Sequence, residues 1–287
     1  MISRLSFIGF GEAAQAFRPA LRARSVAAYD RKTDSASTRA VKYSEYGAAD
    51  VTGCVAPDEA LAECAAALSL VTADQAFAAA EAATGLPVGS FWFDMNSVAP
   101  ETKRAAAAAI KAAGGRYVDV AVMAPVEATG AAVPLLVSGP WAEDASAFLR
   151  GIGFGNVRPL DGPVGAASSV KMIRSVMVKG IEALSAECVL AASAAGVLDE
   201  VVASLNASWP GANWAARFDY NLDRMIVHGS RRAAEMDEVI AALDALDTGS
   251  AMSRATATCQ RTIGAAAIEA PAGLQAKLDL LPSFLRT

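Results

Sequence analysis

A glycine-rich turn near the N-terminus constrains the fold of this 287-residue chain more than any other feature. The apolar run at residues 5–8 leads into Gly9-Phe10-Gly11-Glu12-Ala13-Ala14, and an Ala-rich amphipathic pattern follows. This order predicts a strand, a tight turn and a helix. Gly9 permits the sharp turn, Gly11 lets a phosphate approach the backbone, and Ala14 lets the helix pack against the strand. The motif therefore predicts a dinucleotide site, whose phosphates would meet Gly9, Phe10, Gly11, Glu12 and Ala13 at the start of the helix.

An acidic residue after the second apolar run bears on the identity of the dinucleotide. The run at residues 25–29 is followed by Asp30, 19 residues after Gly11. An acid at this place can accept hydrogen bonds from the ribose hydroxyls of adenosine. Asp30 would also repel the 2′-phosphate of NADP, which favours NAD. Arg31 and Lys32 could instead hold that phosphate, or they are solvated loop charges, so both NAD and NADP stay open.

Composition narrows the class of protein and its partners. The net charge is −5 and no basic cluster exceeds three residues, so we expect no nucleic-acid partner. No run of 18 apolar residues lacks a charge, and a strand is expected at the very N-terminus. We therefore expect no membrane span, no signal peptide and a cytoplasmic location. Four scattered cysteines and a single histidine predict no metal site.

Short apolar runs and helical patterns alternate through the first half of the chain. Further strands are expected near residues 51–54, 67–72, 90–97, 116–122 and 134–139, with a helix over about 100–113. This alternation predicts an α/β fold with a Rossmann-type, doubly wound and mostly parallel sheet. Ligands of such sheets bind beyond the carboxyl ends of the strands. The predicted rim of the pocket is therefore formed by three pairs of residues: Val71 and Thr72, Asn96 and Ser97, and Val122 and Met123.

The second half of the chain lacks this alternation. The segment 161–165 breaks the pattern, and an uninterrupted helical periodicity follows over about residues 166–195. No strand is expected beyond this point. We therefore predict a dinucleotide-binding domain at residues 1–162 and an all-helical domain at residues 163–287, joined by a long interdomain helix.

The candidate for acid–base chemistry lies on this long helix. Lys171 is flanked by apolar residues and shares a broad helical face with Arg174, Ser175 and Glu182. Partial burial lowers the pKa of a lysine, which lets it serve as a general acid or base. Alternatively, Lys171 reaches solvent from the side of an amphipathic helix.

Four segments, taken in order, resemble the β-hydroxyacid dehydrogenase superfamily, which includes 3-hydroxyisobutyrate and 6-phosphogluconate dehydrogenases. They are the glycine-rich turn and residues 94–101, 117–125 and 165–171. The resemblance implies an NAD(P)-dependent dehydrogenase of CH–OH groups that has Lys171 as its general acid/base. It further implies that Asn96 and the backbone of Val122, Met123 and Ala124 orient the nicotinamide and the substrate. A homodimer formed through the helical domain is also implied.

Two departures from the family pattern bear on the substrate. Met123-Ala124-Pro125 stands where the family usually has Ser-Gly-Gly, and Arg174 and Ser175 stand where asparagines are common. These changes imply a different or larger substrate. Together with residues 228–236, they resemble a bacterial, phosphogluconate-dehydrogenase-like branch that carries a C-terminal domain of unknown function.

The segment at residues 228–236 contains the only histidine of the chain. Its spacing puts His228, Arg231, Arg232 and Glu235 on one face of a helix. Two arginines beside a histidine can clamp a carboxylate or phosphate, which favours an anionic or polyhydroxylated small molecule. Together with the residues that the resemblance implies, the predicted substrate-binding residues are Val122, Met123, Ala124, Arg174, Ser175, His228 and Arg231. Alternatively, the arginines form internal or intersubunit salt bridges that use Glu235.

Two other functions stay open at this point. An imine reductase has a similar architecture, but it commonly carries an aspartate or tyrosine where Lys171 stands. A non-catalytic sensor would bind the dinucleotide and use its helical domain as an interaction surface.

Overall fold

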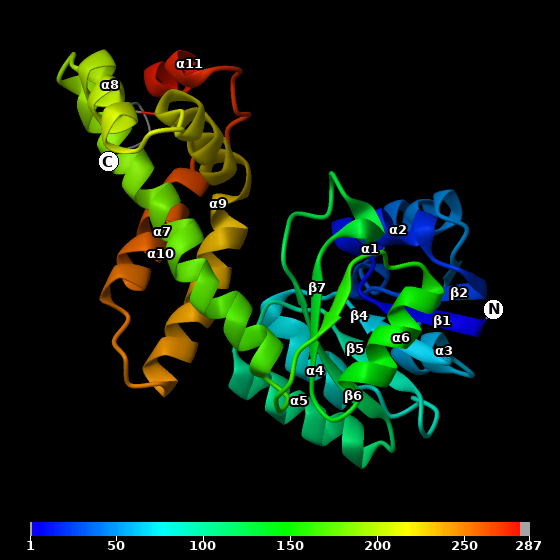
Figure 1. The fold of residues 1–287 in the computed structure, drawn as a ribbon. Coiled ribbons are helices and arrows are strands. Elements are labelled where there is room, and N and C mark those ends of the chain that lie inside the picture. The colour runs from blue at the N-terminus through cyan, green and yellow to red at the C-terminus, as the bar shows by residue number, and fades with distance from the viewer. Residues whose placement is uncertain (1, 282–287) are drawn as a thin grey trace. The chain divides into compact units, whose positions relative to one another are not determined.

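The computed structural model describes residues 2–281 of the chain. The chain divides into two compact units, Met1–Met172 and Ile173–Thr287, both drawn in Figure 1. The sequence placed this boundary between residues 162 and 163. The observed boundary lies ten residues later, because the start of the long helix is bonded to a strand of the first unit. The N–H groups of Gly165 and Ser168 both donate to the carboxylate of Asp119.

The first unit is built on one eight-stranded sheet with the order β3-β2-β1-β4-β5-β6-β7-β8. The strands are β1 (Ile2–Ile8), β2 (Ala23–Tyr29), β3 (Thr52–Gly53), β4 (Ala66–Ser69), β5 (Phe91–Asp94), β6 (Arg116–Val122), β7 (Leu135–Ser138) and β8 (Val157–Pro159). All neighbouring strands are parallel except β6 and β7. The predicted α/β class with a doubly wound Rossmann-type sheet is confirmed. The sequence did not predict β8, because three residues are too few to show a periodic pattern.

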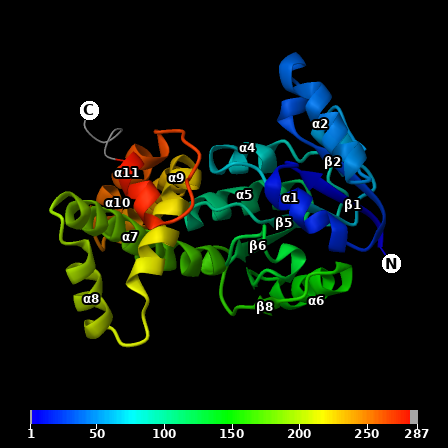
Figure 2. The ribbon, with the colours of Figure 1, turned by 90° about the horizontal axis from the view of Figure 1, so that it is seen from above.

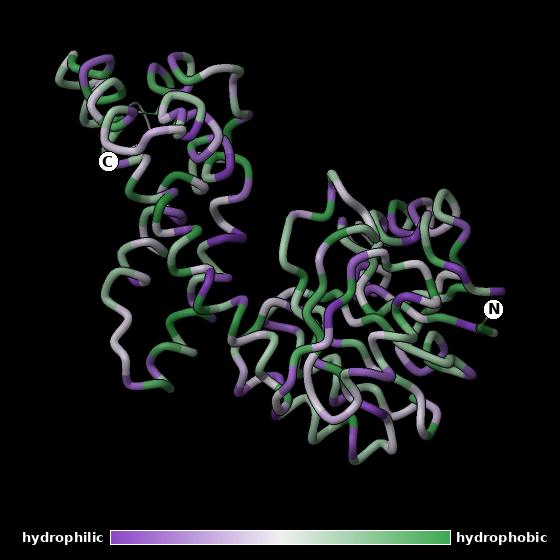
Figure 3. The backbone as a smooth tube through the Cα atoms, in the orientation of Figure 1, coloured by the Kyte–Doolittle hydropathy of each residue, from purple (hydrophilic) through white to green (hydrophobic). Residues whose placement is uncertain are grey.

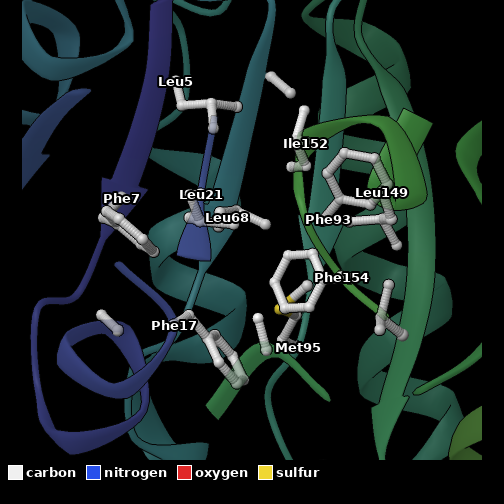
Figure 4. Packing of buried hydrophobic residues seen from close by; sticks show 14 of the residues in the cluster. Leu5, Phe7, Phe17, Leu21, Leu68, Phe93, Met95, Leu149, Ile152 and Phe154 are labelled. Carbon is white, nitrogen blue, oxygen red and sulfur yellow. The ribbon is translucent and has the colours of Figure 1, made fainter. Parts of the chain in front are cut away.

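Helices cover both faces of this sheet, as the view from above in Figure 2 shows. They are α1 (Glu12–Phe17), α2 (Ala36–Ala48), α3 (Pro57–Leu61), α4 (Ala76–Glu81), α5 (Pro100–Ala112) and α6 (Ala142–Ile152). Short 3-10 helices lie at η1 (Arg18–Ala20), η2 (Arg31–Thr33), η3 (Ala73–Gln75) and η4 (Gly130–Ala132). Alternate residues of a strand point to opposite faces, so Phe7 packs with α1, α2 and α6, and Ile8 with α3, α4 and α5. Figure 4 shows the first of these cores.

The second unit is helical throughout its described part, as predicted. Helix α7 (Ala166–Ala194) begins in the first unit, and α8 (Leu198–Ser208), α9 (Trp214–Ala245), α10 (Ala251–Gly264) and α11 (Leu274–Leu280) follow. Hydrophobic and hydrophilic residues alternate along these helices (Figure 3). Their apolar faces enclose a core that includes Val189, Phe218, Leu222 and Met225. The apolar residues that recur at helical spacing in the sequence therefore form the packed core of this unit.

Two glycines bring the backbones of α9 and α10 into contact. A Cβ atom on Gly229 would lie 2.5 Å from the carbonyl oxygen of Gln260, and one on Gly264 would lie 2.4 Å from the backbone nitrogen of Ser230. Any side chain at either position would therefore push the helices apart. Gly229, which follows His228, therefore has a packing role. The sequence alone does not show this role, because it depends on where α10 crosses α9.

Three further observations concern residues 2–281 as a whole. No helix in this range is both long and apolar enough to cross a membrane. The four cysteines are free thiols. Within the same range, no group of three or more His, Cys, Asp or Glu side chains is placed to hold a metal ion.

Candidate functional site

The predicted glycine turn joins β1 to α1. Gly9 has a φ of +86°, and a Cβ atom there would lie 2.5 Å from the carbonyl oxygen of Leu70, so only glycine fits this position. A Cβ atom on Gly11 would meet no atom within 4 Å, which leaves the backbone open to a ligand. Ala14 is fully buried in the core beneath the turn. These three residues have the properties that a pyrophosphate cradle requires.

The carboxylate of Asp30 holds this turn from the end of β2. Its two oxygens accept the backbone N–H groups of Phe10 at 2.8 Å and of Lys32 at 2.9 Å. Lys42 Nζ donates to the carbonyl oxygen of Phe10 at 2.8 Å, donates to Glu45, and lies 3.9 Å from Asp30. The backbone N–H of Phe10 is thus held by Asp30, and its carbonyl oxygen is held by Lys42. A carboxylate has about four acceptor positions, so Asp30 retains the capacity to accept ribose hydroxyls as well.

The other predicted residues around the dinucleotide differ in exposure. Glu12, Arg31 and Thr72 are exposed, and Ala13 and Val71 are half-buried. Lys42 was not predicted to have a role, although it recurs with Tyr46 at i and i+4 on the buried face of α2. A lysine on a buried face implies a charged or carbonyl partner, and that was the available signal.

Asn96 joins the ends of two strands instead of presenting its amide to the outside. Its Oδ1 accepts the backbone N–H of Val71 at 2.8 Å. Its Nδ2 donates to Ser69 Oγ at 3.0 Å and to Asp94 Oδ1 at 2.8 Å. The residue is buried. Because its amide is engaged on both sides, Asn96 fixes the loop that carries the next residue, Ser97.

Lys171 lies beside that loop within the first unit. Its Nζ donates a hydrogen bond to Ser97 Oγ, and its side chain is half-buried. Met123 packs with Ala167, one turn before Lys171 on α7. The structure therefore brings the end of β5, the end of β6 and the start of α7 together. Ser97 was predicted to lie at the rim of the pocket beside Asn96, but its hydrogen bond to Lys171 was not predicted.

A buried carboxylate caps the start of α7. Asp119 Oδ2 accepts the backbone N–H groups of Gly165 and Ser168, each at 3.1 Å, and the hydroxyl of Ser138 at 3.0 Å. A carboxylate at a helix N-terminus satisfies free N–H groups and interacts favourably with the helix dipole. The orientation of the first turns of α7, and so of Lys171, depends on this cap.

A fully buried lysine lies between Asp119 and a second aspartate. Lys103 Nζ, on α5, is 2.9 Å from Asp94 Oδ1 and 3.4 Å from Asp119 Oδ1. The Tyr117 hydroxyl donates to Asp94 Oδ2 at 2.7 Å. Burial, and then the charges of Asp94 and Asp119, hold the pKa of Tyr117 well above its usual value. None of these four residues was predicted to have a role of its own.

Val122 and Ala124, at the end of β6, are half-buried in the first unit, and the other predicted residues belong to the second unit. Arg174 and Arg231 are exposed, Ser175 is buried, and His228 is half-buried. Arg232 faces the core and forms an ion pair with Glu182, which Gln260 Nε2 also contacts at 2.8 Å. The two arginines therefore do not form a joint clamp.

Glu235 has an internal partner in the second unit. It pairs with Lys179 Nζ at 2.8 Å, and burial lowers the pKa of Lys179 while the charge of Glu235 opposes this effect. Internal salt bridges were the predicted alternative for this segment. They are formed by Arg232 and Glu235, with partners on α7 that the sequence did not identify.

Comparison with known proteins gives relatives over the whole chain. Residues 192–263 match the family model "Domain of unknown function (DUF1932)". A conserved hypothetical protein from Sinorhizobium meliloti 1021 is 34% identical, with a TM-score of 0.77 over 99% of this chain and 97% of that one. No curated protein matches the chain.

Two further solved structures share the fold. The conserved protein MTH1747, of unknown function and described as similar to 3-hydroxyacid dehydrogenases, is 29% identical, with a TM-score of 0.69 over 91% of this chain and 99% of that one. The 3-hydroxyisobutyrate dehydrogenase of Mycobacterium tuberculosis is 17% identical, with a TM-score of 0.74 over 98% of this chain and 99% of that one.

Proposed function

The chain belongs to the β-hydroxyacid dehydrogenase superfamily, and from this premise we propose that it oxidises the carbinol carbon of a hydroxy acid or related alcohol, or catalyses the reverse reduction. The family supports an NAD(P)-dependent oxidoreductase in general. The observation that carries the proposal further is the hydrogen bond between Lys171 Nζ and Ser97 Oγ at the end of β5. It holds a lysine at the edge of the sheet where Rossmann-type domains bind their ligands.

Lys171 is the proposed general acid/base. In the oxidative direction its neutral amine takes the proton of the substrate hydroxyl, and in the reductive direction its ammonium returns that proton. Ser97 orients Nζ by accepting one of its N–H groups. The imine reductase alternative is disfavoured, because a lysine stands where those enzymes commonly carry an aspartate or tyrosine.

The glycine turn and the residues around it would hold the dinucleotide. When bound, the nicotinamide would supply the hydride acceptor for oxidation or the hydride donor for reduction. Gly9 and Gly11 give the turn its shape and its open backbone, and Asp30 would accept the ribose hydroxyls. A mostly buried carboxylate at this place supports NAD over NADP, while the exposed Arg31 is the residue that would favour NADP.

The substrate is proposed to be anionic or polyhydroxylated. The candidates for its recognition are Val122, Met123, Ala124, Arg174, Ser175, His228 and Arg231. Arg231 is exposed, whereas Arg232 is buried. An exposed guanidinium is suited to bidentate contact with a carboxylate or phosphate.

A homodimer formed through the helical unit is part of the proposal. Ile173, Met177 and Leu184 on α7 are each at least half exposed and repeat at helical spacing. An apolar stripe of this kind is typical of a helix that packs against another subunit. The expected dimer mass can be measured by light scattering, and Met177→Glu should convert the dimer to a monomer.

A dehydrogenase screen tests the proposed activity directly. Sugar acids, hydroxy acids and aryl-substituted diols should each be assayed with NAD and with NADP, by following absorbance of the reduced nicotinamide. We expect turnover of at least one alcohol that depends on Lys171. Binding of a dinucleotide without turnover of any substrate would instead favour the sensor alternative.

A further inference from the structure

A row of buried polar side chains crosses the sheet of the first unit. Ser69, Asp94, Asp119 and Ser138 are paired in register across β4, β5, β6 and β7. All four are fully buried. Two carboxylates thus stand directly opposite each other on neighbouring strands, an arrangement that is destabilising unless a cation compensates it.

Lys103 supplies that cation from α5. Its Nζ donates to Asp94 Oδ1 at 2.9 Å and to the carbonyl oxygen of Asp94 at 2.7 Å, and it lies 3.4 Å from Asp119 Oδ1. The side chain is fully buried, so its ammonium has no water to replace these partners. One cation between two anions leaves a net negative charge. The N–H groups at the start of α7 and the Tyr117 hydroxyl face that charge.

Each carboxylate of this pair controls one segment of the candidate site. Asp94 Oδ1 accepts the backbone N–H of Asn96 at 3.0 Å and so fixes the loop that carries Ser97. Asp119 Oδ2 caps the start of α7, the helix that carries Lys171. Ser97 and Lys171 are in turn hydrogen-bonded to each other. The Asn96–Ser97 loop and the start of α7 are therefore linked at two places. One link is the hydrogen bond between Lys171 and Ser97, and the other is Lys103, which contacts both Asp94 and Asp119.

We propose that Lys103 is a positioning residue that holds the Asn96–Ser97 loop and the Lys171 helix in a fixed mutual geometry through Asp94 and Asp119. The proposal rests on the proposed function for the role of Lys171, but the coupling of the two segments is a property of the fold. Lys103 touches neither substrate nor cofactor. Its effect passes through the two carboxylates. Asp94 Oδ1, which Lys103 contacts, also accepts the backbone N–H of Asn96. Asp119 contacts Lys103 through Oδ1 and accepts the N–H groups at the start of α7 through Oδ2.

Hydrogen–deuterium exchange tests the coupling without any assay of activity. In Lys103→Met, exchange should become faster by at least about tenfold in peptides covering both residues 94–98 and residues 165–169, because each loses a charge-assisted anchor. Lys111→Met, which removes an exposed lysine from the same helix, should change neither peptide. Faster exchange in only one of the two peptides, or in neither, would overturn the proposal.

A charge-matched pair of variants covers the case in which Lys103→Met does not fold. Asp119→Asn alone should loosen residues 165–169 and leave residues 94–98 as in the wild type. Adding Lys103→Met restores the wild-type net charge of the cluster and should loosen residues 94–98 as well. If the second substitution leaves residues 94–98 unchanged, Lys103 does not position that loop.

Kinetics separates positioning from general stability. With a substrate in hand, Lys103→Met should lower kcat by about 10²-fold while the KM for the dinucleotide changes little, because misplaced reacting groups slow the chemical step. A fall in folded fraction alone would also lower the apparent kcat, so kcat is expressed per molecule of folded protein, counted by dinucleotide titration; only a fall in that corrected kcat supports positioning, and an unchanged corrected kcat contradicts it. If the wild type turns over no alcohol, the proposed function fails, whereas the exchange result still decides the role of Lys103.

Discussion

The carboxylate of Asp30 accepts a hydrogen bond from the backbone N–H of Phe10, 2.8 Å away. The acid that ends β2 is therefore bonded to the middle residue of the Gly9–Gly11 turn. Lys42 holds the same residue by its carbonyl oxygen. Asp30 thus has a role in shaping the turn in addition to its proposed contact with ribose, and substitutions there act on both.

Cofactor choice can be separated from turn geometry by comparing two variants. Asp30→Ser should shift the ratio of NAD to NADP affinity toward NADP by ~1–3 kcal/mol, the scale of charge-assisted hydrogen bonds. It should also weaken both cofactors, because Phe10 loses an acceptor. Lys42→Met should weaken both cofactors alike and leave their ratio unchanged. Fluorescence titration of each protein with each cofactor measures this, and a wild type that prefers NADP would contradict the argument from Asp30.

The two arginines of α9 should behave differently when replaced. Arg232→Met leaves Glu182 buried without its ion pair, which should lower the free energy of unfolding by about 3–5 kcal/mol. Arg231→Ala removes an exposed side chain and should change the free energy of unfolding by no more than about 1 kcal/mol. If Arg231 binds an anionic substrate, its loss should raise KM for that substrate but not for the dinucleotide. Unchanged kinetics in Arg231→Ala would remove it from the site.

The glycine contact between α9 and α10 predicts a position-specific effect of alanine. Gly229→Ala and Gly264→Ala each place a methyl group within 2.5 Å of backbone atoms, and each should cost about 1–3 kcal/mol. Gly180→Ala is the matched control on α7, where the new Cβ would lie 3.9 Å from Thr256 Oγ1. That substitution should stabilise the helix by up to about 1 kcal/mol. Thermal unfolding of the three variants should give two lowered midpoints and one raised midpoint.

Alkaline pH should destabilise the first unit through Tyr29. Burial, and then a hydrogen bond to Asp34 at 2.7 Å, raise the pKa of Tyr29 to about 12 from 10.0. Between pH 10 and pH 12, the hydroxyl of Tyr29 has lost its proton in the unfolded chain and still holds it in the folded chain. The contribution of Tyr29 to stability is therefore complete below pH 10 and is lost as the pH rises toward 12. Tyr29→Phe should show a smaller loss of stability over this interval than the wild type, measured by denaturant unfolding at about pH 9 to 12.

Local patterns predicted most of the elements. The periodicity over residues 166–195 corresponds to α7 at Ala166–Ala194, and the pattern over 100–113 corresponds to α5 at Pro100–Ala112. Such patterns suffice because a helix or strand is specified by residues that are close in sequence. The glycine turn was predicted for the same reason, since its residues lie within one short segment.

Features that depend on strand order and register could not be predicted in this way. Asp94 and Asp119 face each other only because β5 and β6 are neighbours in a particular register. Gly229 and Gly264 meet only because α9 and α10 cross at those positions. One partial signal was present: Lys103 recurs with Ala106 and Ile110 on the buried face of α5. A charge on a buried face predicts a buried partner, although not which one.

Lys171 is the residue on which the proposed chemistry depends. Lys171→Met keeps the length of the side chain and removes its ability to carry a proton. General acid–base groups contribute about 10²–10⁴-fold, so kcat should fall by that factor while the affinity for the dinucleotide is retained. The pH profile of kcat/KM should also lose the limb that belongs to the lysine. Ser97→Ala removes only the hydrogen bond to Nζ and should have a smaller effect on kcat than Lys171→Met. Near-normal turnover by Lys171→Met would show that another group moves the proton, and the family membership would then support the fold and the dinucleotide site alone.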